Sequence, residues 1–209
     1  MPASLSIVHA DAWLVVVDKP PGLPSVPGRA PGLQDCVATR VQALFPEARV
    51  VHRLDMDTSG LMVMGLGLQA QRALSAAFEQ RRTDKRYEAL VLGCPAQASG
   101  SIDLPLRADW PRRPRQIVDL EAGRAALTHW AVRWRGDGMA RLALQPVTGR
   151  SHQLRVHLAA IGHPIVGDPL YGSVDAVGAP HRMCLHATAL SLPHPQDGLR
   201  VHFESAAPF

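Results

Sequence analysis

The sequence lacks the features that would place it in several common classes. Its three cysteines, Cys36, Cys94 and Cys184, are odd in number and far apart, and neither C-x-x-C nor H-E-x-x-H occurs among the 209 residues. A disulfide framework, a zinc site or any other metal site is therefore not expected. No apolar run approaches the roughly 20 residues of a membrane-spanning helix. The first 20 residues lack the basic segment of a secretory signal, so we expect a cytoplasmic protein with no membrane association.

Lysine is nearly absent as well. Lys19 and Lys85 are the two lysines, whereas the other 20 of the 22 basic residues are arginines, and the formal net charge is +4. That charge favours a polyanionic partner without establishing one. Arginine binds phosphate through two N–H groups and stacks on bases, which fits such a partner, although a GC-rich genome would produce the same bias.

The composition that remains, 46% hydrophobic and 19% charged, is that of a globular protein. Short apolar runs and amphipathic segments alternate along the chain. The patterns predict strands at 14–17, 61–66, 87–93, 126–134, 140–147, 184–192 and 200–205, and helices at about 33–45, 70–78 and 151–161. Gly136–Gly138 is expected to turn a hairpin, and Ser151 and Gly162 to begin and end the third helix. This mixed order, without a repeat or linker, predicts an α+β fold in a single domain over 1–209.

The segment HRLDMDTSG, from His52 to Gly60, carries two carboxylates, Asp55 and Asp57, close together. Its DTSG resembles the Asp-Thr-Gly motif of aspartic proteases with one residue inserted. Those enzymes need two carboxylates that share a proton, supplied by two copies of the motif or by a dimer, and no second copy is present. A sugar hydrolase with two carboxylates is another alternative, for which Asp57 would be the second carboxylate.

Two other segments hold residues suited to binding. Thr148-Gly149-Arg150 precedes the third expected helix, whose first N–H groups and Arg150 favour an anion, with Arg155 one turn further on. A capped surface helix with solvated arginines would look the same. Lys85 and Tyr87 alternate in an expected strand, which is equally compatible with an ordinary strand edge.

The combination of these segments resembles the RluA family of RNA pseudouridine synthases. HRLDMDTSG resembles the family motif H-R-L-D-x-x-T-S-G. The family's other motifs are matched, in order, by DKPPGLPSVPG, the Lys-x-Tyr of DKRYEALV, GRSHQLRVH, GHPIVGDPLYG and LHATALSLPHP. The resemblance therefore covers nearly the whole chain. SVPGR and DWPRRPRQ further resemble the members with dual specificity for large-subunit ribosomal RNA and tRNA anticodon stem-loops.

The resemblance implies roles for single residues. Asp55 would be the catalytic carboxylate, oriented and kept ionised by Arg155, and Asp57 would have no role. Tyr87 would stack on the target base and line the pocket, and Arg53 would fill the space that the flipped base leaves, unless Arg53 only contacts a phosphate. Arg112, Arg113, Arg115 and Arg150 are further candidates for RNA contacts, unless their side chains are merely solvated.

The resemblance also implies the pseudouridine synthase fold, a mixed and mostly antiparallel sheet with flanking helices and a central cleft. It implies an isomerase that needs no cofactor and no metal, acts on structured RNA, and is a monomer. Since the chain begins at the catalytic domain, no N-terminal S4-type domain is expected. The remaining alternative is a non-catalytic RNA-binding or chaperone-like protein of the same fold, against which the presence of Asp55, Tyr87 and Arg155 argues.

Overall fold

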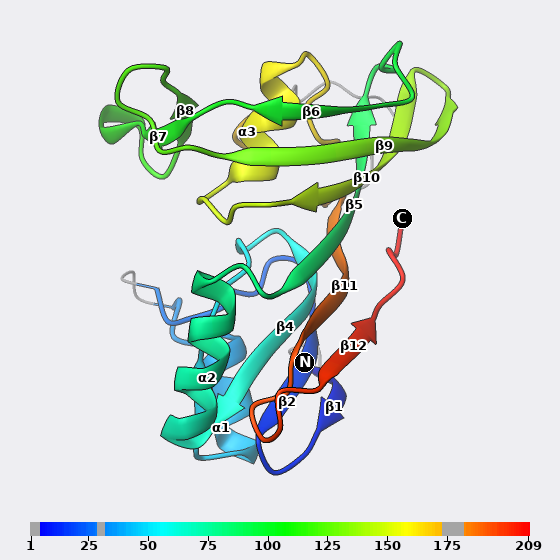
Figure 1. Cartoon of the computed structure of the whole chain (residues 1–209). Helices are drawn as coiled ribbons and strands as arrows, with labels where there is room; N and C mark the ends of the chain where they lie inside the picture. The colour runs from blue at the N-terminus through cyan, green and yellow to red at the C-terminus, as the bar shows by residue number, and fades with distance from the viewer. Residues whose placement is uncertain (1–4, 29–31, 173–181) are drawn as a thin grey trace. The chain divides into compact units, whose positions relative to one another are not determined.

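The computed structural model describes residues 5–28, 32–172 and 182–209. The chain divides into two compact units (Figure 1). The first consists of Met1–Lys85 with His186–Ala207, and the second of Arg86–Leu185 with Pro208–Phe209. A division of this kind does not show that the units fold separately, so the single domain over 1–209 stays a prediction.

The first unit is built on a largely antiparallel sheet. Its strands are β1 (Ser6–Ala10), β2 (Leu14–Lys19), β3 (Ala48–Val50), β4 (Ser59–Leu66), β12 (Arg200–Glu204) and the part of β11 (Leu185–Pro193) from His186 onward. β2 pairs with β1 and β4, β3 pairs with the last residues of β4, and β12 pairs with β11, all antiparallel. The first two residues of β4 pair with β11 in parallel. The strands predicted at 14–17 and 61–66 are thus confirmed, each with longer bounds.

Two helices pack on this sheet, α1 (Val37–Leu44) against β3 and α2 (Gly67–Glu79) against β3 and β4. α1 starts later than predicted because Cys36 caps it: the Cys36 sulfur accepts the N–H of Thr39, and the Thr39 hydroxyl accepts the N–H of Cys36. Leu33, the first residue of the predicted helix, lies outside α1 and is exposed. One buried hydrophobic cluster of the unit consists of Leu14, Val16, Leu61, Val63, Leu74, Leu190 and Leu192.

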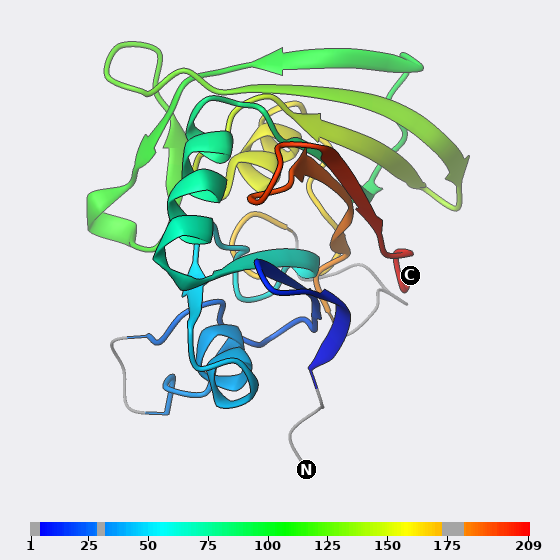
Figure 2. The ribbon, with the colours of Figure 1, turned by 60° about the horizontal axis from the view of Figure 1, so that its bottom comes forward.

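The second unit has a four-stranded antiparallel sheet in the order β5-β10-β9-β6. Its strands are β5 (Asp84–Leu92, from Arg86 onward), β6 (Ser99–Asp103), β9 (Leu127–Gly136) and β10 (Met139–Pro146). The predicted hairpin is confirmed, and Figure 2 shows β9 and β10 running side by side. Asp137 and Gly138 both have positive φ, 53° and 71°, which is the requirement of a two-residue type I′ turn.

A small second sheet and two short helices complete this unit. β7 (Leu106–Ala108) pairs with β8 (Gln116–Val118), and the 3-10 helix η1 (Trp110–Arg112) lies in the loop between them. α3 (Gln153–Ala160) ends before Gly162, as predicted. The prediction that Ser151 caps α3 is wrong: the N-cap is His152, in the left-handed region with φ 53°, and its side chain makes no capping bond.

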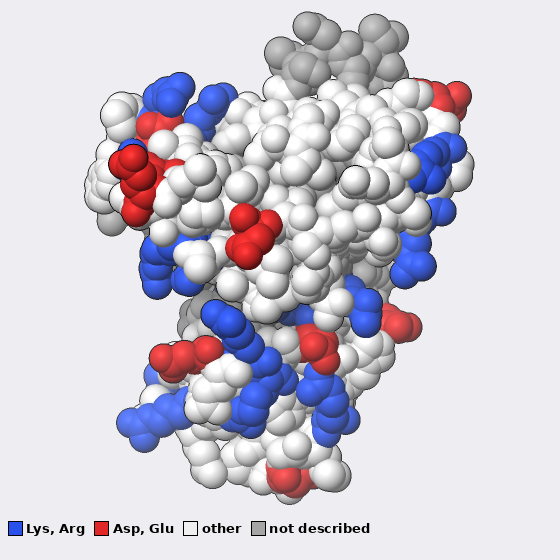
Figure 3. All heavy atoms as spheres, turned by 45° about the horizontal axis from the view of Figure 1, so that its top comes forward, with Lys and Arg blue, Asp and Glu red and all other residues white. Residues whose placement is uncertain are grey.

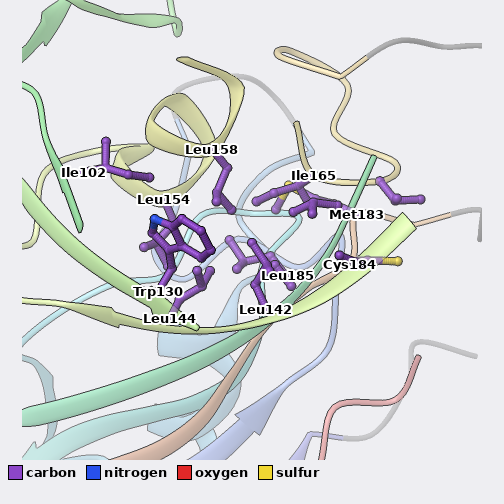
Figure 4. Close-up of a cluster of buried hydrophobic side chains, with 14 residues drawn as sticks. Ile102, Trp130, Leu142, Leu144, Leu154, Leu158, Ile165, Met183, Cys184 and Leu185 are labelled. Atoms are coloured by element: carbon purple, nitrogen blue, oxygen red, sulfur yellow. The ribbon is translucent and has the colours of Figure 1, made fainter. Parts of the chain in front are cut away.

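The core of the second unit lies between its larger sheet and α3 (Figure 4). Leu142 and Leu144 from β10 and Trp130 from β9 pack with Leu154 and Leu158 of α3. Alternate residues of β10 are buried, as the period of two in a half-buried strand requires. The mixture of helices and mostly antiparallel strands in the two units confirms the predicted α+β class. No helix in the described ranges is both long and apolar enough to cross a membrane.

Candidate active site and RNA interface

Asp55 lies in the irregular segment between β3 and β4, in the first unit. Met56 and Asp57 form a turn, and the Thr58 N–H donates to the carbonyl of Asp55 over 3.2 Å. Asp55 and Asp57 are half-buried, whereas Arg53 is exposed. We call residues 53–58 the Asp55 loop. It brings two predicted site residues, Arg53 and Asp55, together on one short segment.

Two buried side chains hold the backbone on either side of Asp55. The Ser25 hydroxyl donates to the carbonyl of Leu54 over 2.7 Å. The N–H of Leu54 in turn donates to the hydroxyl oxygen of Ser25 over 3.0 Å. On the other side, the ammonium group of Lys19 donates to the Met56 carbonyl over 2.7 Å. The loop is therefore fixed at Leu54 and at Met56, the two neighbours of the carboxylate.

Lys19 is fully buried, with 0% of its surface exposed, and it is an anchor that the sequence reasoning missed. Its ammonium also donates to the carbonyls of Pro20 and Leu23, over 2.9 and 2.7 Å. A buried ammonium group must donate hydrogen bonds to strong acceptors, and these backbone carbonyl oxygens accept them. The only signal in the sequence was the segment DKPPGLPSVPG, whose lysine carried no assigned role.

A chain of hydrogen bonds holds the end of the Asp55 loop where β4 begins. The hydroxyl of Ser59 lies 2.8 Å from Nδ1 of the buried His186. On the other side of the ring, Nε2 of His186 lies 3.0 Å from the hydroxyl of Ser205, and this hydroxyl donates to Asp18. Because the one hydroxyl proton of Ser205 points to Asp18, Ser205 must accept from His186 Nε2–H. In the neutral ring Nδ1 then accepts the proton of Ser59. Ser59 is thus fixed by residues from three other parts of the first unit.

Gly60 shows why the motif ends in glycine. It has φ +109°, and a Cβ atom there would lie 2.4 Å from the carbonyl oxygen and 2.5 Å from the nitrogen of Ala187. The backbones of β4 and β11 approach closely at this pair, which is part of their parallel register. Only glycine permits both the positive φ and the close approach.

His52, at the start of the motif, has a structural position. Its ring stacks on Phe78 with centroids 4.4 Å apart, and its Nε2 accepts the N–H of Val63 over 3.0 Å. Burial lowers the pKa of His52 to about 3, and the positive charge of Lys85 acts in the same direction. The ring is therefore neutral at pH 7, as expected of a residue that supports β4.

Arg155 lies in the second unit, on α3, and is 3% exposed. Its Nε and Nη2 donate to the two carboxylate oxygens of Asp168, over 2.8 and 2.7 Å. Asp168 also accepts the N–H groups of Leu170 and Tyr171. This two-pronged contact fixes the plane of the guanidinium. Asp168 was missed as a partner, although it stands in the conspicuous segment GHPIVGDPLYG. The predicted pairing of Arg155 with Asp55 joins residues of different units and stays a prediction.

Tyr171 connects Arg155 to the loop between β7 and β8, within the second unit. The guanidinium carbons of Arg155 and Arg115 lie 5.2 and 5.9 Å from the centre of its ring. Its hydroxyl accepts the N–H of Gln116 over 2.7 Å and lies 2.8 Å from Nδ1 of His152. Two of the predicted site arginines therefore share one aromatic neighbour that the sequence reasoning had not selected.

The start of α3 differs from the expected anion site. The N–H of Arg150 donates to the side-chain carbonyl of Gln153 over 3.0 Å, and the hydroxyl of Thr148 donates to the same oxygen. The Nε of Arg150 donates to the carbonyl of Ala125. The N–H of Arg150 is therefore already used within the protein. A role of Arg150 in RNA binding stays a prediction.

Tyr87 is half-buried in β5, opposite Leu144 of β10, and packs against the core of the second unit.

Arg112 and Arg113 are exposed and Arg115 is half-buried in the loop between β7 and β8. On the face that Figure 3 displays, basic side chains occur in small groups with acidic ones between them. No group of three or more His, Cys, Asp or Glu residues suited to a metal occurs in the described ranges.

The family model for RNA pseudouridylate synthase matches residues 13–160. The dual-specificity RNA pseudouridine synthase RluA of Yersinia pestis is 50% identical over 204 residues, covering 97% of this chain and 99% of the relative. That of Escherichia coli (strain K12) is 47% identical over 206 residues, covering 98% and 94%. The solved structure of human RNA pseudouridylate synthase domain containing 1 has a TM-score of 0.82 at 31% identity, covering 100% of this chain and 87% of its own.

The chain therefore belongs to the RNA pseudouridine synthase family. It is an isomerase in class, and its substrate is RNA. A second human structure, RNA pseudouridylate synthase domain containing 4, agrees in fold with a TM-score of 0.76 at 26% identity. These comparisons confirm the resemblance that the motifs indicated, including its extent along the chain.

Proposed function

We propose that this protein converts specific uridines of large-subunit ribosomal RNA and of tRNA anticodon stem-loops to pseudouridine, as a cytoplasmic monomer. Two curated relatives that cover nearly the whole chain carry dual specificity in their names. The observation that carries the proposal is the Asp55 loop, in which the residues on both sides of a half-buried carboxylate are fixed by buried donors.

The reaction breaks the N1–C1′ bond of uridine, turns the uracil, and joins C5 to C1′, while C5 loses its proton and N1 gains one. A carboxylate suits it, since it can attack the sugar or take a sugar proton and can stabilise positive charge at C1′. Asp55 supplies this carboxylate. A fixed loop favours the reaction because the carboxylate need not be reoriented when the substrate arrives.

The target uridine must leave its stack before it reacts, at a cost of a few kcal/mol. Arg53 has the exposure that this step requires, and its flat guanidinium fills the vacated space or contacts a phosphate. Tyr87 stacks on the flipped uracil. Such stacking is worth roughly 1–3 kcal/mol per base and offsets part of the cost of flipping.

Asp55→Asn tests the proposal, with Asp57→Asn as the matched control two residues further along the same turn. Pseudouridine is mapped in total ribosomal RNA and tRNA from a strain that lacks the gene, after restoring each variant. We expect Asp55→Asn to lose at least about 10³-fold in rate, as removal of a central catalytic group does, and Asp57→Asn to keep most activity.

Three outcomes would contradict parts of this proposal. Unchanged pseudouridine formation with Asp55→Asn would favour the non-catalytic RNA-binding alternative. Equal losses in the two variants would favour a mechanism with two carboxylates. Restoration of pseudouridine in one RNA class alone would contradict dual specificity.

A further inference from the structure

Trp110 is an unusual side chain on the described surface of the second unit. It is 65% exposed, although tryptophan is normally among the more buried residues. It lies in η1, between Asp109 and the arginines Arg112, Arg113 and Arg115. A large exposed aromatic side chain beside basic residues indicates a binding surface, because a partner that covers the ring removes its apolar area from water.

The loop that carries Trp110 is well held. The buried carboxylate of Asp109 accepts from Nε of Arg112 over 2.7 Å, and the carbonyl of Asp109 accepts the N–H of Arg112 over 3.0 Å. The N–H of Asp109 donates to the carbonyl of Arg115 over 2.9 Å. Trp110 therefore projects outward from a closed loop, so its exposure is not a sign of missing local structure.

One face of the indole is already occupied. The guanidinium carbon of Arg113 lies 3.2 Å from the centre of the Trp110 ring. Because Arg113 covers this face, the exposed area of the ring belongs mainly to its other face and its edge. A cation over one face of an aromatic ring holds the ring in place and leaves a flat apolar surface for a second planar group.

We propose that the open face of Trp110 is a stacking subsite for one unpaired nucleobase of the RNA substrate, apart from the target uridine. Arg113 orients the indole, and Arg112, whose side chain is 68% exposed, supplies a phosphate contact beside it. The chemistry fits RNA because bases offer flat faces and phosphates offer negative charge to the same short loop. This inference deepens the proposed function and rests on it for the identity of the ligand as RNA.

Binding of a synthetic tRNA anticodon stem-loop tests the subsite without any need for turnover. The dissociation constant is measured for the wild type, Trp110→Ala, Trp110→Phe and the matched control Trp134→Ala, which removes the other strongly exposed tryptophan of this unit. We expect Trp110→Ala to weaken binding about 10-fold and Trp110→Phe about 3-fold or less, since base stacking on aromatic rings is tolerant of ring type. Trp134→Ala should change binding less than 2-fold, in the range of residues that make no contact.

Abasic substitutions identify the stacked base. Each unpaired loop nucleotide of the RNA is replaced in turn by an abasic one and titrated against the wild type and Trp110→Ala. We expect one position at which the substitution weakens binding to the wild type but not to Trp110→Ala, because both changes remove the same contact. Equal losses for the two proteins at every position would overturn the subsite, as would unchanged binding by Trp110→Ala.

An assay of pseudouridine formation distinguishes failure of the Trp110 subsite from failure of the proposed function. If the wild type forms no pseudouridine in any RNA but shows the abasic coupling, the proposed function fails and the subsite stands. If the wild type is active and the coupling is absent, the subsite fails alone. Thermal melting of Trp110→Ala checks that this variant is folded. If it is unfolded, the abasic titrations are made with Trp110→Phe in its place.

Discussion

The Asp55 loop of the first unit and the segment 109–115 of the second unit, which we call the arginine loop, each connect two strands and are held in opposite ways. The Asp55 loop is fixed by buried side chains that are distant in sequence: Ser25, Lys19 and, through Ser59, His186. The arginine loop closes mainly on itself, through Asp109, and presents charged and aromatic side chains to water. Their comparison teaches that a reacting group needs long-range anchors, whereas a binding surface needs only a stable local shape.

The largest expected effect comes from Gly60→Ala, which acts on the Asp55 loop. The new Cβ would collide with the backbone of Ala187 and would require alanine at φ +109°. We expect a loss of about 3 kcal/mol or more in the free energy of unfolding, measured by urea denaturation, together with loss of activity. Gly198→Ala is the control, because Gly198 has φ +76° with nothing within 4 Å of its Cβ position, and should cost about 1 kcal/mol. Equal costs would show that contact with β11 does not matter.

A double-mutant cycle tests the hydrogen-bond chain that ends at Ser59. We expect His186→Ala and Ser205→Ala each to reduce stability by about 1–3 kcal/mol, since each leaves a polar partner unsatisfied. Because both interrupt one chain, their effects should be less than additive by at least about 0.5 kcal/mol. If the chain also positions the Asp55 loop, kcat should fall more than KM rises. Additive effects on stability would mean that the chain does not act as a unit.

The pH dependence of stability tests the neutral His52. Its pKa is about 3 in the folded protein, against about 6.5 in the unfolded chain. The unfolded state therefore binds more protons between these values, so the contribution of His52 is complete above about pH 6.5 and is lost as the pH falls toward 3. Between pH 7 and 5 the wild type should lose about 1–2 kcal/mol more than His52→Gln, which keeps an acceptor for the Val63 N–H. Parallel curves for the two proteins would contradict a ring that stays neutral in the folded protein.

The smallest effects on stability are expected in the arginine loop. Arg113→Gln should leave the free energy of unfolding within about 0.5 kcal/mol of the wild type, because its side chain is exposed. It should nonetheless weaken RNA binding, because Arg113 holds the indole of Trp110, and the loss of its positive charge beside the RNA should reduce the slope of log Kd against log salt by about 1. Arg133→Gln, an exposed position on β9, is the control and should leave the salt slope unchanged. A large loss of stability with Arg113→Gln would remove the contrast between the two loops.

Much of the fold was predictable because its elements have strong local patterns. The alternation in β10 and the Asp-Gly turn identified the long hairpin, and the spacing of apolar residues identified α2. The failures have physical reasons. Three-residue strands such as β3 and β7 are too short to show a period. The start of α3 was misplaced because the Gln153 side chain, within the helix, binds the preceding backbone in place of the expected serine cap.

The candidate site divides in the same way. Arg53 and Asp55 belong to one short motif, and in the structure they lie in the same irregular segment. The motifs did not indicate that the carboxylate of Asp168 binds the guanidinium of Arg155. They also did not indicate that Arg155 and Arg115 both lie near the ring of Tyr171, or that Arg113 covers one face of the exposed Trp110. Each of these contacts depends on the orientation of a side chain, and no periodicity or spacing specifies it.

The sequence by itself determined the family, the reaction class and the order of the α-helices and of those strands that have a clear hydrophobic pattern, because these follow from motifs and from local hydrophobic periods. Tertiary structure alone decided what holds the site. Lys19 and Met56 are 37 residues apart, and Ser59 and His186 are 127 apart. Contacts at such separations arise only when the sheet of the first unit assembles, since the chain must first close long loops before these groups can meet. The arrangement around Asp55 is for that reason a property of the assembled unit and not of its motif.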